Sequence, residues 1–147
     1  MEVEIDDNAP YFESLDTYKG IKNIVLYFYP KDDTPGCTRE AKDFQAAIDD
    51  FANLDTVVIG VSKDNEKSHE NFKKKHDISF ELISDENSEL SKQYGTWVEK
   101  NMFGKSYMGI DRSTFLIDKN GKIRKIWRNV KVSGHVNNVL EIIREII

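Results

Sequence analysis

The sequence predicts an α/β fold in which helices flank a central mixed sheet. Two apolar segments, residues 24–29 and 56–61, have a helix-like segment between them, and two later strand-like segments are joined by an Asn-Gly turn. A buried strand, a crossover helix and a second buried strand usually form a right-handed parallel unit. Strands joined by Asn-Gly are antiparallel neighbours, because that turn needs a positive φ at its centre. The two kinds of pairing together make the sheet mixed.

The first strands and their crossover helix follow from two different periodicities. Residues 24–29 are β-branched or aromatic without polar alternation, as expected of a strand covered on both faces, and residues 56–61 have the same character. Between them, apolar residues recur at helical spacing, which predicts an amphipathic helix. These apolar residues are Phe44, Ala47, Ile48 and Phe51.

The second half of the chain adds shorter elements. Residues 64–75 are charged and compatible with a helix, and residues 88–94 fit a short one. Residues 113–117 and 122–127 flank the Asn-Gly turn and predict a hairpin. An apolar stripe then predicts a closing amphipathic helix. Its members are Val136, Val139, Leu140, Ile143 and Ile147.

Length and charge bound the class of protein. The 147 residues fit a single domain over 1–147, and 21 basic against 26 acidic residues give a net charge of −5, which disfavours nucleic acid as a partner. The first ten residues lack the apolar segment of a secretory signal, and the longest wholly apolar run, six residues, is too short to cross a membrane. We therefore expect a soluble, cytoplasmic protein without a membrane partner.

The chain has one cysteine, Cys37, which cannot form an intrachain disulfide and fits a reducing compartment. It follows the first apolar strand, where ligands gather in open α/β sheets. Thr34 is a good N-cap and Pro35 a good first helical residue, so Cys37 falls in the first helical turn, where unpaired N–H groups and the helix dipole favour the thiolate. Threonine at position 34, in place of a second cysteine, disfavours thiol–disulfide exchange within the chain.

These residues resemble the peroxiredoxins, and within them the peroxiredoxin Q or bacterioferritin comigratory protein branch. Pro30, Thr34 and Cys37 match the motif Pro-x-x-x-Thr/Ser-x-x-Cys. The resemblance continues through residues 97–100, 104–105, 107–109, 112–118, 127 and 132–140. It implies a thioredoxin-like fold, makes Cys37 the peroxidatic cysteine, and puts Arg112 in the place of the family's active-site arginine.

The implied reaction suits these side chains. The Cys37 thiolate would attack the terminal oxygen of a hydroperoxide and become a sulfenic acid. Thr34 and the Cys37 N–H would bind the peroxide oxygens, and Arg112 would stabilise both the thiolate and the transition state. By resemblance, Pro30 would shield the pocket from water. No metal, haem or flavin cofactor is expected, and no Cys/His spacing suggests a metal site.

One departure from the branch decides how the enzyme is recycled. Many members carry a resolving cysteine five residues after the peroxidatic one, where this chain has Lys42. We therefore expect a 1-Cys peroxidase that reduces hydrogen peroxide and organic hydroperoxides in antioxidant defence. An external thiol such as thioredoxin, glutaredoxin or glutathione, or Cys37 of a second copy, would reduce the sulfenic acid. A monomer or weak dimer is expected.

Two other functions remain open at this point. A peroxide sensor would oxidise Cys37 but recycle it too slowly for turnover, and a structural adaptor would have a slow, ordinary thiol there. Turnover separates them, because a sensor consumes one equivalent of peroxide and an enzyme many. Sequence spacing alone favours a surface position for Arg112, and only the family resemblance places it in the peroxide site.

Several polar residues are expected to have no role in catalysis. Asp32 and Asp33 are adjacent turn residues, and solvated acids are common in turns. The three histidines, His69, His76 and His135, are expected at the surface or at helix caps.

Overall fold

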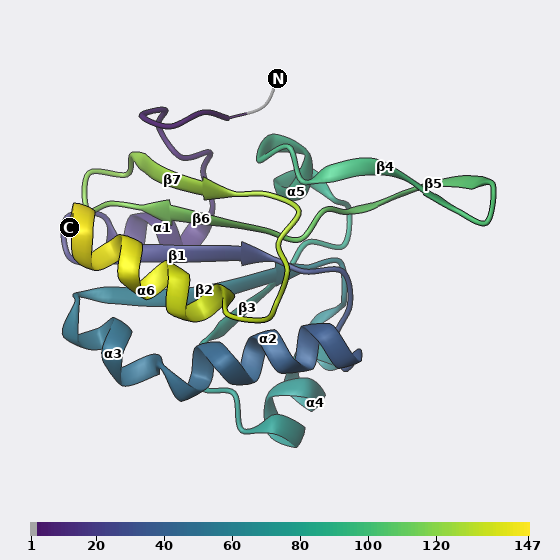
Figure 1. The fold of residues 1–147 in the computed structure, drawn as a ribbon, viewed down its shortest axis with the longest axis horizontal. Coiled ribbons are helices and arrows are strands. Elements are labelled where there is room, and N and C mark those ends of the chain that lie inside the picture. Colours follow the sequence, from purple (N-terminus) through teal and green to yellow (C-terminus); the bar gives the residue numbers. More distant parts are fainter. Residues whose placement is uncertain (1–2) are drawn as a thin grey trace.

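The computed structural model describes residues 3–147. Its main sheet has five strands in the order β3-β2-β1-β6-β7 (Figure 1). The central strand β1 (Asn23–Phe28) pairs in parallel with β2 (Thr56–Ser62), which pairs in parallel with β3 (Glu81–Ser84). On its other side β1 runs antiparallel to β6 (Ser113–Ile117), which continues into β7 (Ile123–Trp127). The predicted α/β fold with a mixed sheet is confirmed.

Helices cover both faces of this sheet (Figure 1). Their bounds are α1 (Glu13–Tyr18), α2 (Pro35–Ala46), α3 (Ile48–Asn53), α4 (Glu66–His76), α5 (Glu89–Gln93) and α6 (His135–Ile146). Successive side chains of β1 point to opposite faces. Tyr27 belongs to the same buried cluster as Phe44 of α2, whereas Phe28 belongs to the cluster that contains Leu15 of α1 and Leu90 of α5. The helices α2, α3, α4 and α6 therefore share one face, and α1 and α5 the other.

Two expected elements differ in detail. The predicted single crossover helix is interrupted at Ala47, whose ψ of 8° breaks the helical run between α2 and α3 while Phe44 and Phe51 stay buried. In the predicted hairpin only Gly121 has a positive φ, at 77°, because the loop between Asp118 and Lys122 has three residues rather than two. The closing helix forms as predicted.

A second sheet is a hairpin that the sequence did not predict. Strands β4 (Trp97–Met102) and β5 (Lys105–Ile110) form it, and it projects away from the body of the molecule (Figure 1). Phe103 and Gly104 make a two-residue turn with φ values of 52° and 78°, and Phe103 is 98% exposed. The hairpin returns to the main sheet just before Arg112.

Within residues 3–147, none of the helices is long and apolar enough to span a bilayer.

Candidate active site

The Cys37 turn lies at the carboxyl end of the central strand. After β1 the chain crosses to Thr34, and α2 begins at Pro35, so Cys37 stands in the first helical turn as predicted. The first helical hydrogen bond runs from the Thr38 N–H to the Thr34 carbonyl at 2.8 Å, which places the Cys37 N–H ahead of it. The side chain is 2% exposed. A sulfur anion here would face the positive end of the helix.

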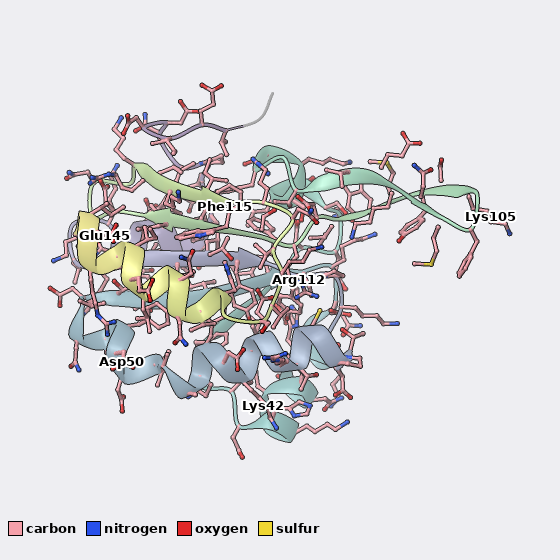
Figure 2. All side chains as sticks on the ribbon, in the orientation of Figure 1. Lys42, Asp50, Lys105, Arg112, Phe115 and Glu145 are labelled. Atoms are coloured by element: carbon pink, nitrogen blue, oxygen red, sulfur yellow. The ribbon has the colours of Figure 1, made fainter. Side chains whose placement is uncertain are left out.

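Arg112 reaches the same sulfur from the neighbouring strand. Because β6 runs antiparallel to β1, the start of β6 lies at the sheet edge where β1 ends. Arg112 precedes β6, and its Nη2 lies 3.4 Å from Cys37 Sγ. Figure 2 places it between the sheet and α2. A Cβ on Gly36 would stand 3.3 Å from Nη2, so the glycine leaves room for the guanidinium. The structure thus brings Cys37 and Arg112 together.

Glu40 binds Arg112, and the sequence analysis did not predict a role for it. Its carboxylate is fully buried at 0% exposure, and its Oε1 lies 2.7 Å from Arg112 Nη1. Burial raises the pKa of Glu40 to about 7, although Arg112 opposes the shift. The other oxygen, Oε2, and the buried hydroxyl of Tyr27 have no hydrogen-bond partner among the described residues. A spacing of three residues from Cys37 along one helix could have pointed to Glu40.

The Thr34 hydroxyl is not used as a helix cap, which corrects the sequence prediction. Thr34 occupies the N-cap position, but its side chain makes no capping bond. Its Oγ1 instead donates to the carbonyl oxygen of Lys31 at 2.8 Å. Since the hydroxyl proton is engaged, its lone pairs remain free to accept a hydrogen bond. Pro30 is exposed, and its shielding role stays a prediction.

Helix α4 also packs against this turn, and it buries residues that were expected at the surface. Asp32 is buried and accepts hydrogen bonds from Tyr29, Ser68 and His69 at 2.5, 2.8 and 2.7 Å. His69 is buried as well, so its expected surface position was wrong. Together with Asp64, Asp32 and His69 lie close enough to hold a cation, but hydrogen bonds already occupy their ligand atoms.

The other two histidines differ in burial: His76 is partly buried and His135 is buried. His76 sits at the end of α4, 2.9 Å from the exposed Asp33, as expected of a residue near a helix terminus. His135 is buried beside Thr114, and burial, reinforced by the charge of Arg112, lowers its pKa to about 4. A neutral ring at that position contributes no charge to the site.

The place of the missing resolving cysteine is on the surface. Lys42 is exposed on the outer side of α2, where Figure 2 labels it. A cavity of about 470 Å³ connects this position with Thr34, Pro35 and Thr38. A thiol from outside the chain can therefore approach the N-terminal end of α2.

Comparison with known proteins identifies the family to which the chain belongs. The AhpC/TSA family profile matches residues 5–126. Peroxiredoxin Bcp of Bacillus subtilis is 49% identical over 154 aligned positions, which cover 99% of this chain and 98% of that protein. A solved cysteine-to-serine variant of Xylella fastidiosa peroxiredoxin Q has a TM-score of 0.90 at 35% identity, covering 99% of this chain and 98% of its own.

A third similar protein is the bacterioferritin comigratory protein of Xanthomonas campestris, solved in work on its alkyl peroxide reduction activity. It has a TM-score of 0.82 at 43% identity and covers 85% of this chain and 80% of its own. With a single cysteine at the N-terminal end of α2, the chain belongs to the AhpC/TSA family, on its peroxiredoxin Q branch, and lacks the second cysteine of many members.

Proposed function

We propose that Cys37 is the peroxidatic thiol of a 1-Cys peroxiredoxin and that Thr34 and Arg112 complete its peroxide site. As a peroxiredoxin the protein is a thiol-dependent peroxidase of the AhpC/TSA family. The observation that carries the residue assignment is the 3.4 Å contact between Arg112 Nη2 and Cys37 Sγ at the start of α2. A fixed cation and a helix N-terminus both favour a sulfur anion over a neutral thiol.

The first half-reaction is a two-electron oxidation of sulfur. The Cys37 thiolate attacks the terminal oxygen of ROOH, a sulfur–oxygen bond forms, and the oxygen–oxygen bond breaks. The products are the sulfenic acid and an alkoxide that takes up a proton to become ROH, or water when the substrate is hydrogen peroxide. Arg112 and the Cys37 N–H stabilise the charge that grows on the leaving oxygen, and Thr34 accepts a hydrogen bond from the peroxide O–H.

The second half-reaction needs two thiols from outside the chain. The first, R′SH, condenses with the sulfenic acid to a mixed disulfide and releases water. The second attacks that disulfide, restores the Cys37 thiol and leaves R′SSR′. The sequence supports this route, because Lys42 stands where a resolving cysteine would be and Cys37 has no partner within the chain.

The substrates and setting follow from the same chemistry. The alkyl peroxide reduction described for the Xanthomonas campestris relative supports organic hydroperoxides beside hydrogen peroxide. We place the enzyme in the cytoplasm, where glutathione, glutaredoxin or thioredoxin supplies thiols. It acts there as a monomer or weak dimer, without nucleic-acid or membrane partners, and residues 1–147 form one thioredoxin-like domain.

A single-turnover experiment tests the proposal. Reduced protein is mixed with one equivalent of hydrogen peroxide, and the Cys37 mass is followed with a trap for sulfenic acids. We expect rapid oxidation at Cys37, loss of the signal in Cys37→Ser, and recovery of the thiol with a reductant. With excess peroxide and that reductant, we expect many turnovers. A thiol that reacts no faster than free cysteine would refute the function, whereas rapid oxidation without recovery by any reductant would favour a sensor.

A further inference from the structure

A buried ion pair behind the Cys37 turn has no part in the mechanism above. Asp32 and His69 are 6% and 4% exposed, and His69 Nδ1 lies 2.7 Å from an Asp32 carboxylate oxygen. On the opposite side of the ring, Nε2 lies 3.0 Å from the carbonyl oxygen of Ile83 on β3. An ionised carboxylate and a carbonyl can only accept hydrogen bonds. Both contacts are hydrogen bonds at the same time only when both ring nitrogens carry a proton, that is, when His69 is an imidazolium.

The surroundings of Asp32 favour its ionised form. Its oxygens accept hydrogen bonds from Tyr29, Ser68 and His69. Burial raises the pKa of Asp32, but these three hydrogen bonds outweigh it and the net pKa is lowered. Burial lowers the pKa of His69, but Asp32 outweighs it and the net pKa is raised. The titratable groups that face the ring are Asp32 from the loop, Asp64 from the β2–α4 connection and Tyr29, which directly follows β1.

This pair is linked to the peroxide site through one peptide group. The backbone N–H of Asp32 donates to Asp64 Oδ2 at 2.8 Å. That N–H and the carbonyl of Lys31 belong to the same planar peptide unit. The Lys31 carbonyl in turn accepts the proton of the Thr34 hydroxyl at 2.8 Å. Holding Asp32 by its side chain and its backbone therefore sets the direction of the Lys31 carbonyl and of the Thr34 hydroxyl.

The loop also needs an anchor for a second reason. The next residue, Asp33, has a φ of 59°, in the left-handed region that residues other than glycine seldom occupy. Such a conformation persists when its surroundings hold it. The contact of Asp33 with His76 is exposed, whereas that of Asp32 with His69 is buried and less screened by water.

We propose that His69 is a positioning residue for peroxide reduction, which as an imidazolium fixes loop 31–34 so that the Thr34 hydroxyl presents its lone pairs to the peroxide. The inference rests on the function proposed for Cys37. Loss of the ring proton or of the ring breaks one link to Asp32 or Ile83 and frees the loop. The contact of Cys37 with Arg112 is held by α2 and β6 and remains. The expected signature is slower reaction with peroxide at unchanged reactivity of the thiolate toward other electrophiles.

The test compares His69→Gln with a matched control, His76→Gln, which alters the exposed pair between the same helix and the same loop. Two second-order rate constants are measured for each protein, one with hydrogen peroxide and one with iodoacetamide, which needs the thiolate but not Thr34. In His69→Gln the peroxide constant should fall about 10- to 100-fold, as for a small misplacement of a binding group, while the alkylation constant stays close to wild type. His76→Gln should change neither constant.

An equal fall in both constants, or an unchanged peroxide constant, overturns the proposal. If His69→Gln does not fold, the wild-type protein supplies the test through nitrogen NMR of the ring. Both ring nitrogens should carry protons at pH 7, and the ratio of the two rate constants should fall as the ring loses its proton at higher pH. A neutral ring at pH 7, or a flat ratio through its titration, overturns it. If the wild-type thiol does not react rapidly with peroxide, the proposed function itself is refuted, whether or not His69 is protonated.

Discussion

Replacing Arg112 by methionine should slow peroxide reduction without unfolding the protein. At 3.4 Å and an effective dielectric constant of about 20, its charge interacts with a Cys37 thiolate by roughly 5 kcal/mol. Part of this is offset, because Glu40 already has a pKa of about 7 beside Arg112 and will take up a proton when the cation is gone. One negative charge then leaves the neighbourhood together with the positive one. The expected loss is that of a preorganised donor to a developing oxyanion, about 100- to 1000-fold.

Stopped-flow mixing of reduced protein with hydrogen peroxide at pH 7 measures this rate constant. Arg124→Met is the matched control, because Arg124 also makes an ion pair at 3.4 Å, with Asp118 away from Cys37. The double variant Arg112→Met/Glu40→Gln should match Arg112→Met, since Glu40 is then neutral in both. A rate constant for Arg112→Met equal to that of the control would remove Arg112 from the mechanism.

Three further predictions concern the residues around the site. Gly36→Ala brings a Cβ to 3.3 Å from Arg112 Nη2, so the guanidinium must shift and the peroxide reaction should slow. Stopped-flow mixing checks this, and an unchanged rate constant would contradict it. Glu40→Gln removes a carboxyl whose pKa burial raises from 4.5 to about 7. As the pH rises from 4.5 to 7, the wild type should therefore lose roughly 3 kcal/mol of stability relative to the variant. Parallel curves of unfolding free energy against pH would refute this. The pKa of His69 is raised in the folded protein, so its contribution to stability is complete below the ordinary pKa and is lost as the pH rises through the raised pKa. His69→Gln should therefore lower the free energy of unfolding by about 3–5 kcal/mol near pH 6 and by less at higher pH. A loss of stability that does not change with pH would contradict the ion pair.

Local patterns in the sequence were enough to locate the thiol. A buried strand followed by Thr34, Pro35 and Cys37 specifies a strand-to-helix turn within a few residues, and the structure has that turn. Arg112 depended on the family resemblance, because its place beside Cys37 comes from the antiparallel pairing of β1 with β6. No local periodicity encodes which distant strand will pair with β1.

The features that the sequence did not predict also depend on contacts between distant parts of the chain or on unusual backbone conformations. Asp32 and His69 read as polar surface residues because each is flanked by charged neighbours, and they become buried only when α4 packs over the turn. The β4–β5 hairpin was missed because its turn needs a positive φ at Phe103, a residue that rarely adopts one. Glu40 alone carried a usable signal, three residues after Cys37 on the same helix.

The pairing of β1 with β6 also bears on how the chain is made. Cys37 leaves the ribosome 75 residues ahead of Arg112, and the two meet only after β6 has joined the sheet. Such long-range pairing forms late relative to local helices. We therefore expect a nascent or partly folded chain to carry its cysteine without Arg112 beside the sulfur. If Arg112 assists peroxide reduction as proposed, fast reaction with peroxide should develop only once β6 has paired with β1.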